Sequence, residues 1–371
     1  MKVINQFYKL SELYRNGVFI FICLIIAIIG SLFIPDFRVS KADKQLYGIN
    51  GSAVKFEDTE MVDHFFNSIK SNNGILILGT SESGNYKTGN YFHFLNDDPT
   101  LADVRFSVIG GAGRTCGLHI PLFLRHREAV KGLRVYYFVN PIYWRVGLST
   151  LNKVYWIRDH NYISLTNIQL TPDEQQKYFK PVNEYISSLS TSEKMMQYSE
   201  FYLHSFLSKY NQDLSYLISP EKYMNSLEFC TIPKGLKHYP NLGVIDSAAM
   251  NLSWNITNEY FLNKGYSSAD TINTHRTIEL ESFIRLCSDL DVDITYILGP
   301  LNKKYIEKHE SFDNYRDAVS AIRNVLQTHN ASFIDLSDLS EIDGAFNDLQ
   351  HHSSYGAYLI YQRIKSHLYE Q

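Results

Sequence analysis

The 371-residue chain is poor in cysteine, and its four cysteines, at positions 23, 116, 230 and 287, show no paired spacing. Because no Cys-x-x-Cys motif is present, we expect no zinc site and assign no metal and no cofactor. A single disulfide among the last three cysteines stays open. Positive charge is not in excess either. The net charge of -4 gives no electrostatic reason to expect nucleic-acid binding.

Internal repeats and low-complexity tracts are also absent from the sequence. The glycine-rich stretch that begins at Gly110 is not followed by Lys-Ser or Lys-Thr. This absence excludes the phosphate-binding loop of nucleoside triphosphatases, in which that lysine contacts the phosphates.

An uncharged apolar run covers residues 17–34 (GVFIFICLIIAIIGSLFI). As an α-helix it would extend about 27 Å, which is close to the hydrocarbon thickness of a bilayer. The run is long for the apolar part of a signal peptide, and no Ala-x-Ala cleavage site follows it. We therefore favour an uncleaved transmembrane anchor over a cleaved signal peptide or a buried helix.

Lysine and arginine flank the run on both sides, so the charge bias discriminates little between the two orientations. A short N-terminal tail before a first helix usually stays in the cytoplasm. We expect residues 1–16 to be a cytoplasmic tail and residues 17–34 a single-pass anchor in the cytoplasmic membrane. A polar linker at 35–55 and an extracytoplasmic domain at 56–371 would follow.

Short apolar runs alternate with helical patterns along this domain, for example at 278–290 and 353–369. The alternation predicts an α/β fold with a doubly wound parallel sheet. A region at about 145–275 breaks the alternation. It is tyrosine-rich and mostly helical in pattern, and we interpret it as an insertion beside the site. The predicted strands are Ile75–Leu78, Val104–Ile109, Leu133–Val139, Asp293–Leu298 and Ser332–Leu336.

Ser81 follows the first predicted strand in the sequence Gly79-Thr80-Ser81. Ligands of such sheets bind beyond the carboxyl ends of the strands, which makes Ser81 a candidate nucleophile. Ser83 is a rival nucleophile. Alternatively, Ser81 only caps a helix, which is the common role of a serine in this position.

Asp348 and His351 lie three residues apart between the last predicted strand and the last predicted helix. Such a pair is common by chance, so its position carries the weight. Residues at this spacing share a face, so the aspartate could bind one imidazole nitrogen while the other faces Ser81. The three residues would then form a Ser-His-Asp triad, in which histidine takes the serine proton and aspartate fixes its tautomer. His352 is the alternative base.

Two further strand ends are candidates for the oxyanion hole that acyl transfer to serine requires. Gly110 follows the second strand and permits a close approach of its backbone N–H. Asn140 ends the third strand before a proline. It could instead only begin a turn, since asparagine before proline often does.

Ser81, Gly110, Asn140 and the pair Asp348/His351 occur in the order of the SGNH (GDSL-like) hydrolase blocks, which the chain resembles. That resemblance implies a flavodoxin-like three-layer α/β/α sandwich. Residue by residue, it implies that Ser81 is the nucleophile, that Asp348 and His351 complete the triad, and that Gly110 and Asn140 are oxyanion donors. The chain departs from these blocks in that the third one lacks its glycine.

Within this superfamily the chain resembles the DltD family, the D-alanyl transfer proteins of teichoic-acid D-alanylation. The resemblance rests on the apolar run and on three short stretches. The stretches are Gly79-Thr-Ser-Glu82, Asp348-x-x-His351 with Gly356, and Pro300-Leu-Asn-Lys-Lys-Tyr305. Thr80 replaces the family's usual serine, and His351 is followed by His-Ser-Ser rather than Leu-Gly-Trp.

This resemblance implies a serine acyltransferase or esterase that acts on D-alanyl esters of a cell-envelope polymer. It also implies two partners, a membrane O-acyltransferase and an acyl carrier protein. Asn302, Lys303 and Tyr305 would be substrate contacts, unless they form only a surface loop. The alternatives are a carbohydrate O-acetyl esterase on the same fold and a non-catalytic envelope scaffold.

Overall fold

The computed structural model divides the chain into two compact units, one of which contains the N-terminal helix and the other the β-sheet. Most of the predicted insertion at 145–275 lies outside the described residues. The structure describes residues 12–32, 48–50, 59–83, 90–110, 115–144, 171–174, 176–179, 190–192, 274–309, 312–346 and 348–370.

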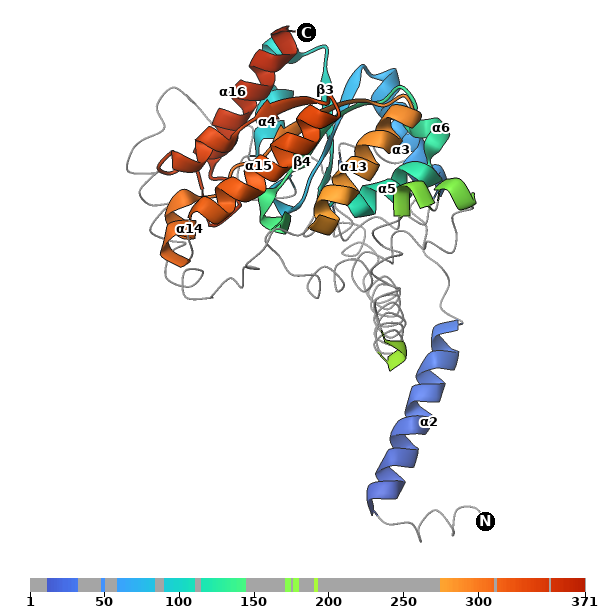
Figure 1. The fold of residues 1–371 in the computed structure, drawn as a ribbon. Coiled ribbons are helices and arrows are strands. Elements are labelled where there is room, and N and C mark those ends of the chain that lie inside the picture. Colours follow the sequence, from blue (N-terminus) through green and yellow to red (C-terminus); the bar gives the residue numbers. More distant parts are fainter. Residues whose placement is uncertain are drawn as a thin grey trace. The chain divides into compact units, whose positions relative to one another are not determined.

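A six-stranded parallel sheet with the strand order β1-β3-β2-β4-β5-β6 forms the centre of the second unit (Figure 1). Without the edge strand β1, this is the order 2-1-3-4-5 of flavodoxin-like folds. The predicted α/β class and parallel sheet are confirmed. The strands are β1 (Gly48–Asn50), β2 (Gly74–Leu78), β3 (Arg105–Gly110), β4 (Arg134–Val139), β5 (Asp293–Leu298) and β6 (Ser332–Asp335).

All five predicted strands are present, with end points that differ by at most one residue. A sixth strand, β1, was not predicted: it lies in the segment 35–55, which the sequence predicted to be a linker, and it pairs with β3. A strand of three residues has too few positions to show an alternating or continuous apolar pattern.

Helices cover both faces of the sheet, which gives three layers (Figure 1). Two of them, α4 and α16, pack on one face, while α3, α5 and α13 lie on the other, with α15 against α13. These elements are α3 (Thr59–Ser71), α4 (Tyr91–Asp97), α5 (Cys116–Arg125), α6 (Arg127–Val130), α13 (Thr274–Asp289), α14 (Lys303–His309), α15 (Phe312–Thr328) and α16 (Ser354–Glu370).

The core sits on both sides of β2, because successive side chains of a strand point to opposite faces. Ile75 and Ile77 belong to the cluster under α4 and α16, which also contains Ile360. On the other face, Tyr137 of β4 contacts Phe283 of α13, with ring centroids 5.3 Å apart. A strand buried on both faces needs a continuous apolar sequence, as Gly74-Ile-Leu-Ile-Leu78 has.

The buried cysteines belong to the same core. Cys116 and Cys287 carry free thiols, and Cys230, the third cysteine of the open disulfide prediction, lies outside the described residues.

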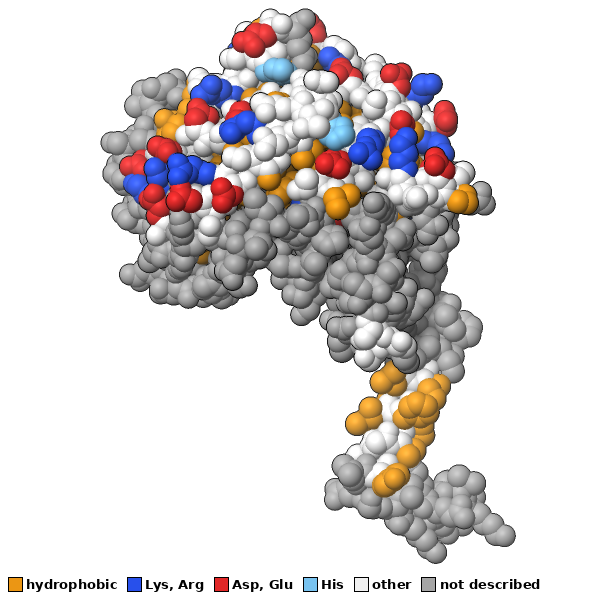
Figure 2. Space-filling view, viewed as in Figure 1, with side chains coloured by type: hydrophobic (Ala, Val, Ile, Leu, Met, Phe, Trp, Pro, Cys, Tyr) orange, Lys and Arg blue, Asp and Glu red, His pale blue; other side chains and the backbone are white. Residues whose placement is uncertain are grey.

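The N-terminal apolar run forms helix α2 (Glu12–Leu32). Its apolar side chains from Phe19 to Ile26 are largely exposed within this unit, as Figure 2 shows. Among the described parts of the chain, no helix is both long and apolar enough to cross a membrane. The membrane anchor stays a prediction.

Candidate active site

Ser81 lies just beyond the carboxyl end of β2, at the start of a single-turn helix, Ser81–Ser83. Its side chain is half-buried, so a ligand can reach it. The strand leaves the sheet through Gly79, where a Cβ atom would lie 2.1 Å from Ser83 Oγ. Only glycine leaves room at position 79 for the side chain of Ser83. The first strand of the flavodoxin-like order thus ends in the candidate nucleophile, beside the end of β4 at the switch point of the sheet.

Asp348 and His351 lie on a turn between β6 and α16. One carboxylate oxygen of Asp348 accepts the backbone N–H groups of Gln350 at 2.9 Å and His351 at 2.7 Å. Asparagine and aspartate commonly stabilise turns in this way. At the start of α16, a Cβ atom on Gly356 would lie 2.0 Å from the backbone oxygen of Ala345. Glycine at 356 therefore permits the first turn of α16 to pack closely against the backbone of Ala345.

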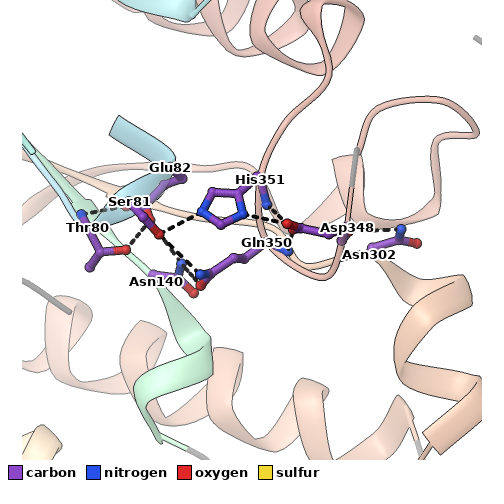
Figure 3. A network of polar contacts seen from close by, with 8 residues as sticks. All are labelled: Thr80, Ser81, Glu82, Asn140, Asn302, Asp348, Gln350 and His351. Carbon is purple, nitrogen blue, oxygen red and sulfur yellow. Dashed lines mark hydrogen bonds and ion pairs between the residues drawn. The ribbon is translucent and has the colours of Figure 1, made fainter. Parts of the chain in front are cut away.

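The turn brings its two side chains to Ser81 across 270 residues of sequence (Figure 3). His351 Nε2 is 2.7 Å from Ser81 Oγ, and His351 Nδ1 is 2.6 Å from the second carboxylate oxygen of Asp348. The sequence predicted that these three side chains lie within mutual hydrogen-bonding reach, and the structure brings them together in that order.

The electrostatics of the pair suit a base oriented by a carboxylate. Burial opposes ionisation of Asp348, but the hydrogen bonds and charge of His351 outweigh burial and lower the pKa of Asp348. Burial also disfavours protonated His351, yet the hydrogen bond and charge of Asp348, with a smaller contribution from Glu82, raise the pKa of His351 above its usual value.

His352, the alternative base, is buried away from Ser81. Its ring lies 5.6 Å from that of Phe138 and 5.5 Å from that of Phe346. Burial, together with the charge of His351, lowers the pKa of His352 to about 3. Ser83, the rival nucleophile, is fully buried, and its hydroxyl is 2.7 Å from that of Tyr91. Of the two candidate bases and the two candidate nucleophiles, the structure therefore brings together His351 and Ser81.

Glu82, to which the sequence analysis gave no role beyond its place in the stretch Gly79-Thr-Ser-Glu82, is buried next to Ser81. It accepts hydrogen bonds from the backbone N–H of Thr80 at 2.7 Å and from the Thr80 hydroxyl, and Asn140 Nδ2 donates to it at 3.2 Å. Burial raises the pKa of Glu82, although these hydrogen bonds oppose the effect. Its signal in the sequence is a charged residue directly after the candidate nucleophile.

Asn140 lies at the end of β4 next to the Ser81 turn, where the sequence predicted an oxyanion donor, but its amide is engaged elsewhere. Its Nδ2 donates to Glu82 and to Gln350 Oε1, the latter at 3.0 Å, and its Oδ1 accepts the backbone N–H of Ile142 at 3.1 Å. Gly110, the other predicted donor, is the buried last residue of β3, and the neighbouring Ile109 accepts the Gly79 N–H at 3.2 Å. Both residues are thus at the predicted edge of the sheet.

Gln350 is the second residue that the sequence analysis missed. Its Nε2 lies 3.2 Å from Ser81 Oγ, and it therefore connects Asn140 to the serine (Figure 3). Its position between Asp348 and His351 in the turn is the signal that could have drawn attention to it.

Of the three predicted substrate contacts, Asn302 directly precedes α14, and Lys303 and Tyr305 belong to this helix. Asn302 is buried, and its Nδ2 donates to the backbone oxygen of Asp348. Lys303 pairs with Glu341 at 3.1 Å. Burial and the charge of Asp348 raise the pKa of Tyr305. Asn302 and Lys303 line a cavity of about 200 Å³ whose lining does not include Ser81 or His351.

Metal binding has no candidate among the described residues, where no cluster of three or more His, Cys, Asp or Glu side chains occurs. The side chains that meet at Ser81 offer a hydroxyl, an imidazole and carboxylates. These are the groups of nucleophilic acyl chemistry.

The site and the parallel α/β sheet were compared with known protein families and solved structures. The family model described as DltD protein matches residues 254–369 of the chain. The matched region contains Asp348, Gln350 and His351 but not Ser81. The predicted resemblance to that family is thereby confirmed. No curated protein matches the chain.

Two solved structures resemble the chain at 10% sequence identity. An acetyl xylan esterase, AlAXEase, has a TM-score of 0.36 and covers 80% of this chain and 99% of its own. The protein YXIM from Bacillus subtilis has a TM-score of 0.35 and covers 81% of this chain and 57% of its own. The fold assignment above rests on the strand order of this chain and not on these neighbours.

Proposed function

We propose that this chain is an extracytoplasmic serine acyltransferase or esterase, held at the membrane by α2, that passes D-alanyl esters to or from a cell-envelope polymer through Ser81. One observation carries the proposal. His351 Nε2 is 2.7 Å from Ser81 Oγ while Nδ1 of the same ring is 2.6 Å from Asp348. The DltD match over the part of the chain that holds Asp348 and His351 supports the choice of D-alanyl esters.

The chemistry follows from the direction of these contacts. Ser81 Oγ attacks the carbonyl carbon of the acyl donor, its proton moves to His351 Nε2, and the carbonyl π bond opens to an oxyanion. The carbon–oxygen or carbon–sulfur bond of the donor then breaks, and the leaving group takes the proton from His351. An acceptor hydroxyl or water repeats these steps on the acyl-serine and releases Ser81. Asp348 holds the imidazole and stabilises its protonated form throughout.

The backbone N–H of Gly110 remains the proposed oxyanion donor on β3. It belongs to the strand adjacent to β2, at the edge of the sheet where Ser81 lies. Preorganised donors of this kind are usually the largest electrostatic contribution to acyl transfer.

We propose that α2 anchors the chain to the membrane, because its apolar side chains from Phe19 to Ile26 are exposed. We also propose the two partners that DltD resemblance implies, a membrane O-acyltransferase and an acyl carrier protein. The carrier or the O-acyltransferase would supply the acyl group, and the polymer would accept it. Protease accessibility of residues 50–371 in intact spheroplasts tests the orientation, and protection from protease would contradict it.

The enzyme test compares the wild-type chain with Ser81→Ala and with Ser83→Ala on two substrates, a D-alanylated polymer and p-nitrophenyl acetate. We expect Ser81→Ala to abolish D-alanyl transfer and Ser83→Ala, which leaves Ser81 in place, to keep it. Hydrolysis of p-nitrophenyl acetate without action on D-alanyl esters would favour the O-acetyl esterase. Full transfer by Ser81→Ala would contradict the proposed nucleophile.

A further inference from the structure

We propose that Gln350 is a catalytic residue of the Ser81 site. Its side-chain amide directs the hydroxyl proton of Ser81 toward His351 and then donates to the oxyanion of the acyl intermediate. This inference rests on the proposed function. It starts from the contact between Gln350 Nε2 and Ser81 Oγ, which are 3.2 Å apart.

The orientation of the Gln350 amide is determined by a backbone group. The backbone N–H of Ile142 donates to Asn140, so the atom that faces it must be the amide oxygen Oδ1. The other end of the Asn140 amide is then Nδ2, which donates to Gln350 Oε1. Because Oε1 accepts from Asn140, the atom of Gln350 that faces Ser81 must be the donor Nε2.

This donor decides where the serine proton lies. Ser81 Oγ accepts from Gln350, and its single proton is then free to point at His351 Nε2, 2.7 Å away. Nε2 accepts that proton only if the imidazole carries its own proton on Nδ1, and Nδ1 faces Asp348 at 2.6 Å. The row of hydrogen bonds from Ile142 to Asp348 thus has one consistent direction, and that direction prepares Ser81 for attack.

The same amide can act in the next step. When Oγ bonds to the acyl carbon, the serine proton moves to His351 and the carbonyl electron pair becomes an oxyanion that is separated from Oγ by a single carbon atom. Gln350 Nε2 carries two N–H groups, and within the described residues it donates only to Ser81 Oγ. An N–H of this amide is therefore within reach of the new negative charge.

Asn140 cannot take this role in the observed arrangement. Its Nδ2 also carries two N–H groups, and these donate to Glu82 and to Gln350. Asn140 is 3% exposed, whereas Gln350 is half-buried beside Ser81. Asn140 thus fixes the donor, and Gln350 is the donor that faces the reacting atoms.

The test measures kcat, KM and the pH profile of p-nitrophenyl acetate hydrolysis by the full-length chain and two variants. Gln350→Ala removes the amide, and Gln350→Glu keeps its size but replaces the donor by an acceptor. We expect kcat to fall about 100-fold to 1000-fold in both, with KM changed less than about 3-fold, as for the loss of one oxyanion donor.

The pH profile separates a catalytic from a structural role. Gln350→Ala leaves the contact between Asp348 and His351 in place, so we expect a lower plateau with an unmoved acid limb. In Gln350→Glu the added negative charge should raise the pKa of His351 and so move the acid limb of the pH profile to higher pH. As controls, Gln362→Ala and Gln362→Glu make the same changes on α16, where Gln362 is exposed and donates to the Tyr358 hydroxyl, and both should leave kcat unchanged.

Two results would overturn the inference. If the wild type hydrolyses p-nitrophenyl acetate and Gln350→Ala keeps full kcat, or raises only KM, the inference fails while the Ser81 nucleophile of the proposed function stands. If the wild type neither hydrolyses the ester nor forms an adduct at Ser81 with an alkylphosphonate, the proposed function fails and this inference fails with it. If Gln350→Ala does not fold, Gln350→Glu takes its place: full kcat in that variant would overturn the inference in the same way.

Discussion

His351 and His352 are neighbours in the chain, but only the ring of His351 reaches Ser81, whereas that of His352 packs between Phe138 and Phe346. The backbone N–H of His351 is held by the Asp348 carboxylate, whereas the backbone of His352 forms an isolated bridge with Phe346. One ring is thereby available for proton transfer, and the other becomes part of the core.

We therefore predict opposite results for the same substitution at the two histidines. His351→Gln should lower kcat/KM for ester hydrolysis by about 10⁴-fold or more, as for the loss of a triad base. His352→Gln should change it less than about 10-fold, since that ring is buried and stays neutral at neutral pH. Equal losses in both variants, with unchanged thermal midpoints, would contradict the assignment of the base.

The second prediction concerns the pH dependence of activity. Only neutral His351 can accept the serine proton, so kcat/KM should rise with pH through the pKa of His351, which lies above its usual value. In Asp348→Asn the charge that raises this pKa is gone, and burial, which lowers it, remains. The acid limb should then move to lower pH, and the plateau should fall by about 10⁴-fold. A limb that moves to higher pH would contradict the role of Asp348.

The third prediction concerns Asn302, which connects the end of β5 to the Asp348 turn. Its Nδ2 donates to the backbone oxygen of Asp348 at 3.1 Å, and its backbone N–H donates to the backbone oxygen of Leu349 at 2.9 Å. Asn302→Ala should loosen the turn and lower kcat about 10-fold to 100-fold, because small displacements of catalytic groups are costly. A large rise of KM with unchanged kcat would instead indicate the substrate contact that the sequence predicted.

A matched control for Asn302 is available directly after the last residue of α3. Asn72 is exposed, and its side chain donates to the backbone oxygen of Ser68 at 2.7 Å, far from Ser81 in the fold. Asn72→Ala removes the same kind of bond from a helix end and should leave kcat and KM unchanged.

The fourth prediction concerns stability and Asp98, which connects the segment after α4 to α16. One carboxylate oxygen accepts from Lys365 and Tyr361, each at 2.6 Å, and the other accepts the Thr100 N–H at 2.9 Å. Burial opposes ionisation of Asp98, but these hydrogen bonds outweigh it and lower its pKa. Asp98→Asn should reduce the free energy of unfolding by about 1–3 kcal/mol at pH 7.

The sign of the pH dependence follows from the lowered pKa. A carboxylate whose pKa is lower in the folded state stabilises the fold fully above its unfolded pKa, and this contribution is lost as the pH falls toward the folded value. The difference between wild type and Asp98→Asn in urea denaturation should therefore be full at pH 7 and shrink below about pH 4. A difference that grows with acidity would contradict the assignment.

Much of the fold could be predicted because a parallel sheet covered on both faces needs continuous apolar strands. Runs such as Ile75–Leu78 and Asp293–Leu298 are therefore visible in the sequence. The carboxyl ends of such strands meet at one edge, which is why Ser81 and Asn140 could be expected to lie close together. The strand β1 could not be predicted, because three residues are too few to carry a pattern.

The hydrogen bonds around Ser81 that involve Asn140, Glu82 and Gln350 were not predictable for a different reason. Which end of the Asn140 amide faces Gln350 depends on the backbone N–H of Ile142, and which carboxylate receives Asn140 depends on the burial of Glu82. These are relations among rotamers and burial, and the residue types alone do not determine them. The sequence therefore predicted the side chains that the structure brings together, Ser81, His351 and Asp348, but not the amide that contacts Ser81.

The central claim, that the Ser81 hydroxyl is the nucleophile activated by His351, is tested most directly by mass mapping of the adduct formed with an alkylphosphonate. Folded wild-type protein should carry one phosphonate on Ser81, His351→Gln should react far more slowly, and Ser81→Ala should carry none. An adduct on Ser83, or a wild-type protein that stays unmodified while folded, would contradict the claim.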